Sequence, residues 1–232
     1  MNSGQAPLRA PTALAFDLDG TLVDTVETRI RAWLAVFDEF GIPATRDDVA
    51  PMIGIDGKQL ARDVAEAAGE PLPAGRDEEI DRRCGEIYES FNRDPQPLPG
   101  ARELLRWLDG LGWPWAIATS SRREQVGTSL AALSLDRDPT IVDGSSVEHA
   151  KPAPDLLLAA AEALGRSAAE CWCIGDSTWD MRAATAAGMV PVGVTAGAAV
   201  PEAALREAGA SLVAATLMEL QAELHRTRGE SV

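Results

Sequence analysis

The sequence is short of positive charge: 21 Lys and Arg residues stand against 36 Asp and Glu residues, which gives a formal net charge of −15. Proteins that bind nucleic acid use clustered Lys and Arg side chains to neutralise phosphates, so this balance excludes a nucleic acid partner. It disfavours an anionic membrane surface for the same reason. A small phosphorylated metabolite stays possible, because a metal ion and one or two basic side chains can reverse the potential locally.

Long apolar runs and cysteines are also scarce. No stretch of the 232 residues approaches the length of a membrane-spanning helix, and residues 1–11 lack the basic and apolar stretches of a signal peptide. We therefore expect a cytoplasmic protein, whose oligomeric state the sequence does not set. Cys84, Cys171 and Cys173 are expected to be buried, reduced thiols, the last two on opposite faces of a strand.

Two carboxylates follow an apolar run near the start of the chain. Residues 12–16 indicate a strand buried on both faces, and Asp17-Leu18-Asp19-Gly20-Thr21 comes directly after it. Asp17 and Asp19, two residues apart, are predicted to point the same way. Adjacent acids raise each other's pKa unless a cation lies between them, so the pair indicates a metal site or divided acid and nucleophile roles. The alternative is an Asp-Gly turn beside a solvated acid.

Helix and strand patterns divide the rest of the chain. Apolar residues recur at helical spacing from about residue 25 to residue 94, and the proline-rich residues 94–100 then indicate an extended linker. Beyond them, helices alternate with short apolar runs, which is the pattern of parallel strands joined by right-handed crossovers. We predict an α/β fold, with a Rossmann-like parallel sheet core formed by residues 1–24 and 95–232 and a helical insertion at residues 25–94.

Polar residues stand at the ends of three predicted strands, at Asp17, Thr119 and Asp176, which is the sheet edge where open α/β folds bind ligands. Four motifs in order resemble the haloacid dehalogenase-like hydrolases, in the phosphatase branch whose helical cap is inserted after the first motif. They are Asp17-Leu18-Asp19-Gly20-Thr21, Ala118-Thr119-Ser120-Ser121, Lys151-Pro152-Ala153-Pro154-Asp155 and Gly175-Asp176-Ser177-Thr178-Trp179-Asp180. The resemblance spans nearly the whole chain.

The resemblance implies a magnesium-dependent phosphatase that hydrolyses a small phosphomonoester, phosphoglycolate-like or a sugar phosphate, through an aspartyl-phosphate. Asp17 is the implied nucleophile. Asp19 is the implied general acid and then base, which needs a pKa near the working pH, and we expect neighbouring Asp17 to supply that shift. Mg²⁺ is expected on the carboxylates of Asp17 and Asp176 and the backbone carbonyl of Asp19, with Asp180 orienting a metal-bound water.

The resemblance also implies how the phosphoryl group is held. Four positions are predicted to bind the substrate: Gly20, Thr119, Ser120 and Ser121. The Thr119 hydroxyl and the Ser120 amide are expected to donate to phosphate oxygens, and Lys151 is expected to supply the positive charge that lets Asp17 approach an anion. Taken singly, Thr119 is equally well an ordinary helix N-cap and Lys151 a solvated residue before a proline turn.

Substrate selection is assigned to the inserted helices. Residues 53–60 resemble the cap of phosphoglycolate phosphatases, and Lys58 and Arg62 are the candidates for reading a second carboxylate on the substrate. The alternative is that both are solvated charges on a helix face. We expect the cap to close over the strand ends, hinged near residues 24–25 and 95–100, and to exclude bulk water.

Two other functions stay open. One is a sugar-phosphate mutase of the β-phosphoglucomutase type, although such mutases resemble Glu-Asp-Ser where this chain has Gly175-Asp176-Ser177, and carry an arginine at the position of Gly57. A mutase must hold a second phosphate in the cap, so the missing arginine counts against it. The other is a non-catalytic phosphate-binding protein. The presence of Asp17, Asp19, Lys151 and Asp176 disfavours it.

Overall fold

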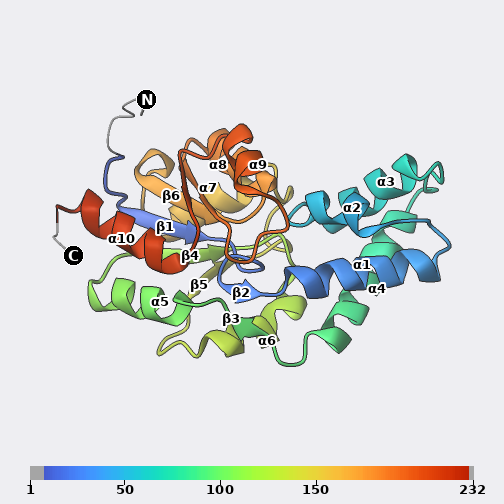
Figure 1. Cartoon of the computed structure of the whole chain (residues 1–232), viewed down its shortest axis with the longest axis horizontal. Coiled ribbons are helices and arrows are strands. Elements are labelled where there is room, and N and C mark those ends of the chain that lie inside the picture. The colour runs from blue at the N-terminus through green and yellow to red at the C-terminus, as the bar shows by residue number, and fades with distance from the viewer. Residues whose placement is uncertain (1–7, 230–232) are drawn as a thin grey trace.

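A six-stranded parallel sheet forms the centre of the protein, in the order β5-β4-β1-β6-β7-β8 (Figure 1). The computed structural model describes residues 8–229. The strands are β1 (Ala13–Phe16), β4 (Trp115–Ala118), β5 (Thr140–Val142), β6 (Cys171–Gly175), β7 (Val190–Val194) and β8 (Leu212–Ala214). All four residues of β1 are buried, because β1 lies between β4 and β6 and is covered on both faces. The predicted α/β fold is thus confirmed.

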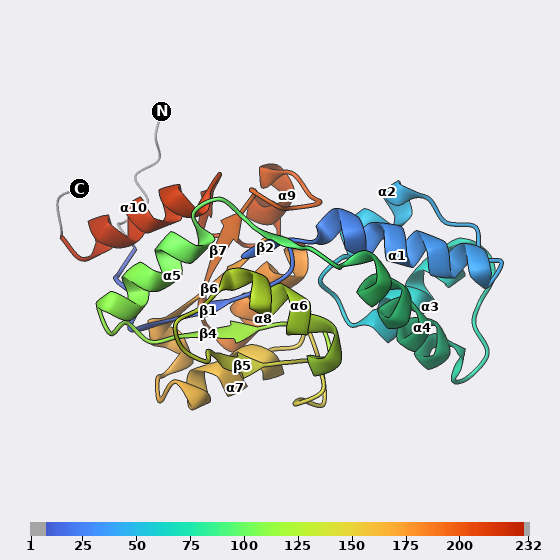
Figure 2. The same cartoon turned by 90° about the horizontal axis from the view of Figure 1, so that it is seen from below.

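Helices cover both faces of the sheet (Figure 2). Leu14 and Phe16 of β1 join one apolar cluster with α5 (Ala101–Gly110), α6 (Arg123–Leu133) and α10 (Leu217–Thr227). Ala13 and Ala15 point the other way, into a cluster with α7 (Asp155–Ala163) and α8 (Thr178–Ala187). The single turn η2 (Ala168–Glu170) and the short helix α9 (Glu202–Glu207) complete this part. The alternation along β1 therefore sets the two layers.

The helices that follow the first motif pack on one another and have an apolar cluster of their own. They are α1 (Val26–Glu39), α2 (Arg46–Val49), the turn η1 (Ala50–Met52), α3 (Gly57–Ala67) and α4 (Arg76–Phe91). In both cartoon views they lie beside the sheet, beyond the carboxyl ends of its central strands. The division of the chain into a core and a cap domain stays a prediction.

Two short strands connect these helices to the sheet. Strand β2 (Val23–Asp24) precedes α1, and β3 (Gln96–Pro97) follows α4; the two pair antiparallel, with Val23 opposite Pro97. Within the proline-rich stretch, Gln96 and Pro97 are extended as predicted, while Pro99 and Gly100 form a turn. Its pairing with β2 was not predicted, because two-residue strands carry no periodic signal.

The cysteines are all free and buried, in agreement with the sequence-based expectation. The expectation that Cys171 and Cys173 lie on opposite faces was wrong: both join the cluster on the α7 and α8 side, since residues two apart in a strand share a face. Within residues 8–229, no helix is long and apolar enough to cross a bilayer. A cytoplasmic location stays an expectation.

Candidate active site

The carboxyl ends of three central strands bring together residues that are far apart in the sequence. Asp17 follows β1, and its amide donates to the Ile174 carbonyl of β6 at 2.8 Å. Thr119 follows β4, where its amide donates to the Val142 carbonyl at 3.0 Å. Asp176 follows β6 directly. The parallel sheet therefore places these three side chains at one edge, as the sequence pattern predicts.

Lys151 lies between two buried acids. Its ammonium is 2.6 Å from Asp17 Oδ1, to which it donates a hydrogen bond, and 2.6 Å from Asp180 Oδ1. The contact to Asp180 is an ion pair without hydrogen-bond geometry, because Asp180 Oδ1 has no hydrogen-bond partner among residues 8–229. The other Asp180 oxygen accepts from the amide and the hydroxyl of Ser177, which closes the capping box of α8. Helix α8 thus fixes Asp180 against Lys151.

The charges in this cluster are unbalanced. Burial raises the pKa of Asp17 to about 7, and Asp180 adds to the rise while Lys151 opposes it. Burial and then Asp17 raise the pKa of Asp176 well above its ordinary value. Burial alone would lower the pKa of Lys151, but Asp17 and Asp180 outweigh it and keep the ammonium charged. One lysine thus faces three buried acids, which leaves excess negative charge.

The acids fit a hard divalent cation. Asp17, Asp176 and Asp180 each offer a carboxylate oxygen, and these oxygens lie within 4.8 Å of one another. A set made of oxygen donors alone matches the preference of Mg²⁺, and a bound cation would lower the raised pKa values of Asp17 and Asp176. The chemistry of the donor set therefore supports the predicted metal site, with Asp180 shared between it and Lys151.

The backbone of Gly20 lies directly against the Asp176 carboxylate. Its φ of +83° is a conformation that favours glycine, and a Cβ there would lie 2.3 Å from Asp176 Oδ2. The Gly20 amide donates to the Val23 carbonyl at 2.8 Å, while the next residue, Thr21, donates its hydroxyl to Asp176 Oδ1 at 3.1 Å. Contact between Gly20 and substrate stays a prediction.

Asp19 is held by residues of the inserted helices and of the sheet edge together. Arg29 Nη2 lies 2.8 Å from Asp19 Oδ2, and the Ser121 hydroxyl donates to the same oxygen at 2.9 Å. The hydroxyls of Thr25 and Tyr88 donate to Asp19 Oδ1 at 2.6 and 3.1 Å. The Arg29 guanidinium stacks 3.6 Å from the centre of the Tyr88 ring. Each oxygen of the Asp19 carboxylate therefore accepts contacts from two side chains.

The expected raised pKa of Asp19 was wrong. Burial alone would raise it, but the Arg29 guanidinium and the hydrogen bonds from Thr25 and Ser121 outweigh burial and lower the pKa. Asp17, which was expected to set this pKa, has less influence than the cation that lies in contact. In this arrangement Asp19 is ionised at neutral pH.

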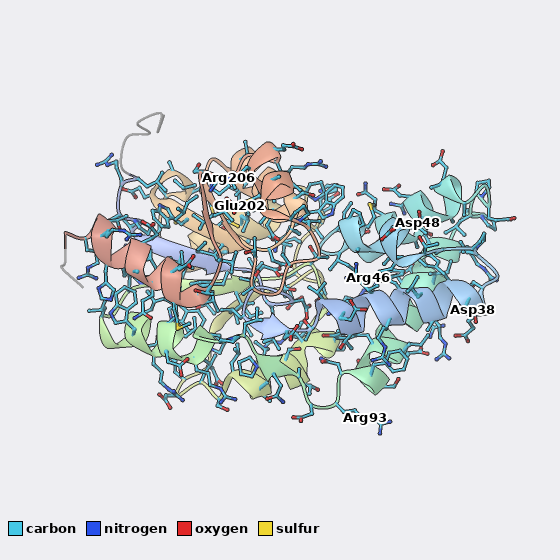
Figure 3. The ribbon with its side chains drawn as sticks, in the orientation of Figure 1. Asp38, Arg46, Asp48, Arg93, Glu202 and Arg206 are labelled. Atoms are coloured by element: carbon cyan, nitrogen blue, oxygen red, sulfur yellow. The ribbon has the colours of Figure 1, made fainter. Side chains whose placement is uncertain are left out.

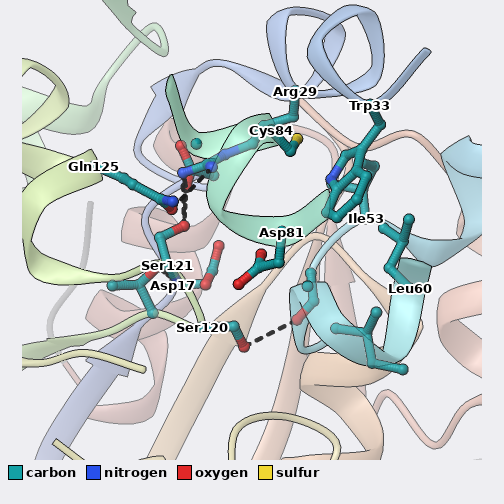
Figure 4. Close-up of a pocket in the computed structure, with 16 residues that line it drawn as sticks. Asp17, Arg29, Trp33, Ile53, Leu60, Asp81, Cys84, Ser120, Ser121 and Gln125 are labelled. Atoms are coloured by element: carbon teal, nitrogen blue, oxygen red, sulfur yellow. Dashed lines mark hydrogen bonds and ion pairs between the residues drawn. The ribbon is translucent and has the colours of Figure 1, made fainter. Parts of the chain in front are cut away.

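Three of the four residues predicted to hold the phosphoryl group, Thr119, Ser120 and Ser121, line a cavity together with Asp17 (Figure 4). Gly20 is not among the described residues that line it. The Thr119 hydroxyl accepts from the Ser121 amide at 3.1 Å, and the Ser120 hydroxyl donates to the Gly54 carbonyl of the inserted segment at 3.0 Å. The Ser121 hydroxyl belongs to the network around Asp19. The structure thus brings all three to the site, where substrate contact stays a prediction.

The inserted helices form the other wall of this cavity of about 60 Å³, to which they contribute Trp33, Leu60 and Asp81. Lys58 and Arg62 are not among the described residues that line it. Lys58 is half-buried, and Arg62 is exposed and pairs with Asp77, so the cavity gives no support to their predicted role, which stays a prediction.

Sequence reasoning missed Arg29 and Asp81, which both line the cavity. Neither belongs to a motif. Arg29 lies four residues after Thr25, the N-cap residue of α1, and hence on the same side of the helix, but this spacing alone does not show that this side meets the site. Asp81 on α4 has no comparable signal, because the packing of α4 on α1 and α3 decides which of its faces meets the cavity.

Comparison with known proteins agrees with the fold. The chain is 35% identical to the chloroplastic protein SUPPRESSOR OF QUENCHING 1 of Arabidopsis thaliana over 87% of its own length, but spans only 19% of that protein. It is 35% identical to the phosphoglycolate phosphatase of Neisseria gonorrhoeae, covering 80% of each chain. It is 31% identical to the beta-phosphoglucomutase of Bacillus subtilis, covering 80% of this chain and 84% of that protein.

A hydrolase from Pseudomonas syringae of known crystal structure superimposes with a TM-score of 0.88 at 34% identity, covering 94% of this chain and 99% of that one. Residues 14–194, which include all four motifs, match the haloacid dehalogenase-like hydrolase family. The match covers more than half of the chain. The protein therefore belongs to the haloacid dehalogenase-like hydrolases.

Proposed function

We propose that this protein is a magnesium-dependent phosphatase that hydrolyses a small phosphomonoester through an aspartyl-phosphate on Asp17. The observation that carries the proposal is the buried contact between Asp17 Oδ1 and Lys151 Nζ at 2.6 Å, beside Asp176 at the same sheet edge. A carboxylate that is buried, paired with a cation and open to a cavity is placed to act as a nucleophile. Phosphatases among the related proteins support the reaction class.

In the first half-reaction, an oxygen of Asp17 attacks phosphorus, and the bond from phosphorus to the leaving oxygen breaks. Asp19 gives its proton to that oxygen. Lys151 lowers the pKa of Asp17, which favours its carboxylate form, and offsets the charge of the phosphoryl group, which the Thr119 hydroxyl and the Ser120 amide bind. Bound at Asp17, Asp176 and the Asp19 carbonyl, Mg²⁺ would neutralise developing charge on the phosphoryl oxygens.

In the second half-reaction, ionised Asp19 takes a proton from the water that attacks the aspartyl-phosphate, which releases phosphate and restores Asp17. The contact with Arg29 suits this step, because it favours the carboxylate form of Asp19. The first step needs the protonated form. We propose that the inserted helices, residues 25–94, act as a cap whose opening draws Arg29 away and lets Asp19 take up a proton.

The cap proposal is supported by contacts between the inserted helices and the sheet edge. The Trp179 indole donates to the Pro51 carbonyl at 2.9 Å, and the Asp56 amide donates to the Lys151 carbonyl at 3.3 Å. Opening would also break the contacts of Arg29 and Tyr88 with Asp19 and of Ser120 with Gly54. The β2 and β3 pair is a short connection suited to a hinge. Closure would exclude bulk water from the aspartyl-phosphate.

A β-phosphoglucomutase-type reaction is less well supported, although one relative carries that name. Where a mutase needs an arginine for the second phosphate, this chain has Gly57, and a Cβ at that position would lie 1.9 Å from an oxygen of Asp81. The space is thus filled by a carboxylate, which repels a second phosphate. A non-catalytic binder is disfavoured because Asp17, Asp19, Lys151 and Asp176 are all present, with Lys151 in contact with Asp17.

The proposal is tested by phosphate release from a panel of phosphomonoesters, with magnesium and with EDTA. We expect magnesium-dependent release that Asp17→Asn abolishes. Asp38→Asn removes the same charge from an exposed position on α1 (Figure 3) and is expected to keep full activity. Release that survives Asp17→Asn would overturn the nucleophile assignment. Isomerisation of a sugar phosphate in the presence of a bisphosphate primer, without net phosphate release, would favour the mutase.

A further inference from the structure

A carboxylate from α4 faces the cavity on the side away from the strand ends. In Figure 4 the Asp81 side chain points into the space bordered by Asp17 and Ser120. Its Oδ2 accepts from Arg122 Nη2 at 2.9 Å. No hydrogen bond to Asp81 Oδ1 is found within residues 8–229, so this oxygen is free to accept one from a ligand. The side chain is 14% exposed.

Gly57 makes room for this carboxylate. A Cβ at residue 57 would lie 1.9 Å from Asp81 Oδ1 and 3.4 Å from the Trp33 ring. Any side chain at this position would therefore have to displace Asp81. The space in which a basic residue could meet a second anionic group of a substrate is occupied by an acid and the edge of an indole ring.

The cations near the cavity do not cancel the negative charge that Asp81 presents to a bound substrate. Among the described residues that line the cavity, Arg29 is the only cation, and it is paired with Asp19 and stacked on Tyr88. Arg122 pairs with Asp81 from outside the lining, and the Arg122 side chain is 38% exposed, so solvent screens its charge more strongly than that of Asp81. The cap wall therefore presents a hydrogen-bond acceptor with negative charge to the substrate.

We propose that this site selects phosphomonoesters whose alcohol part is uncharged and carries a hydroxyl group, and rejects esters with a second anionic group, with Asp81 as the selecting residue. This inference rests on the proposed phosphatase function. A substrate hydroxyl would donate to Asp81 Oδ1, and carbon-bound hydrogens would pack on Trp33 and Leu60. A substrate carboxylate or second phosphate would meet like charge there. Of the two predicted substrate classes, this favours sugar or polyol phosphates over phosphoglycolate.

Paired esters that differ in one group provide the test. 2-Hydroxyethyl phosphate carries a neutral hydroxymethyl group where 2-phosphoglycolate carries a carboxylate, and the two are otherwise identical. Glycerol 3-phosphate and 3-phosphoglycerate differ in the same way. We expect kcat/KM in magnesium to be larger for the neutral member of each pair by at least about tenfold, equal to about 1.4 kcal/mol. The ratio should diminish as the salt concentration rises.

Two substitutions should change this ratio in opposite directions. Asp81→Asn keeps the shape of the side chain and removes its charge, so we expect it to bring the ratio of each pair close to one. Arg122→Gln leaves Asp81 without its partner, so we expect it to increase the preference for the neutral ester. Glu89→Gln removes one charge from an exposed position of the same helix and should leave the ratio as it is in the parent.

Three results would overturn the inference. A parent protein that prefers the carboxylate member of each pair would contradict the selection directly. Substitutions at Asp81 and Arg122 that lower activity on both members equally would show a structural role alone. If the parent hydrolyses no ester of either kind with magnesium, the proposed phosphatase function itself fails and the selection fails with it, whereas hydrolysis with the opposite preference leaves that function intact.

Discussion

Replacing Lys151 by methionine should destabilise the metal-free protein strongly, because it leaves buried acids without their cation. The Lys151 side chain is 1% exposed and lies 2.6 Å from carboxylate oxygens of both Asp17 and Asp180. Methionine has a similar length, so little packing is lost. Removing one partner of a buried ion pair costs about 3–5 kcal/mol of unfolding free energy, which for a chain of this size lowers Tm by roughly 6–20 °C.

The loss should depend on pH in a defined direction. The folded pKa of Asp17 is raised to about 7 from an unfolded value of 3.8, so between these values the native state holds more protons than the unfolded state, and stability falls as pH rises. Removing Lys151 raises this pKa further. The deficit of Lys151→Met relative to the parent should therefore be smaller near pH 5, where Asp17 is protonated in both proteins, than above pH 7, while the contact with Asp180 is lost at either pH.

Urea unfolding in EDTA, followed by the fluorescence of the six tryptophans, measures this effect from pH 5 to pH 8. Lys58→Met is the matched control, since Lys58 is half-buried and lies outside the cavity lining, and we expect it to change stability by less than about 0.5 kcal/mol. A Lys151→Met protein as stable as the parent at pH 8, or a deficit that grows toward pH 5, would refute the reasoning.

Three further predictions concern the same site. Gly20→Ala should lower both stability and magnesium affinity, because its Cβ meets Asp176 Oδ2 and its φ of +83° disfavours alanine; unchanged magnesium binding by calorimetry would contradict this. Arg29→Met should move the alkaline limit of kcat/KM to higher pH, since the cation that lowers the pKa of Asp19 is gone; an unmoved limit would mean that Asp19 is not the proton donor. Asp176→Asn should lose magnesium-dependent turnover. In EDTA it should become more stable than the parent as pH rises, because it removes an acid whose raised pKa makes the parent lose stability over that range. Urea midpoints equal to those of the parent at high pH would argue against the charge excess.

The sheet and the meeting of its strand ends could be predicted from the sequence because their signals are local. Short apolar runs followed by polar residues mark β1, β4 and β6, and parallel strands necessarily bring Asp17, Thr119 and Asp176 to one edge. The glycine after Asp19 also carries a local signal, because a sharp turn is required where the strand ends.

The environment of Asp19 could not be predicted in this way. Its pKa depends on a guanidinium from α1 that reaches it only when the inserted helices lie against the sheet edge. Helical spacing places Arg29 on a face but does not say which face meets the site. The same holds for Asp81, which lines the cavity, and for Lys58 and Arg62, which do not line it, because helical spacing does not decide which face of α3 or α4 meets the site.

The central claim is that Asp17 carries the phosphoryl group during turnover. The most direct measurement is mass spectrometry of peptides from the magnesium-loaded parent, quenched in acid while it hydrolyses an excess of a good ester. We predict a phosphoryl adduct on the peptide that contains Asp17, absent from Asp17→Asn and from samples treated with EDTA. Steady phosphate release without that adduct, together with turnover by Asp17→Asn, would contradict the account.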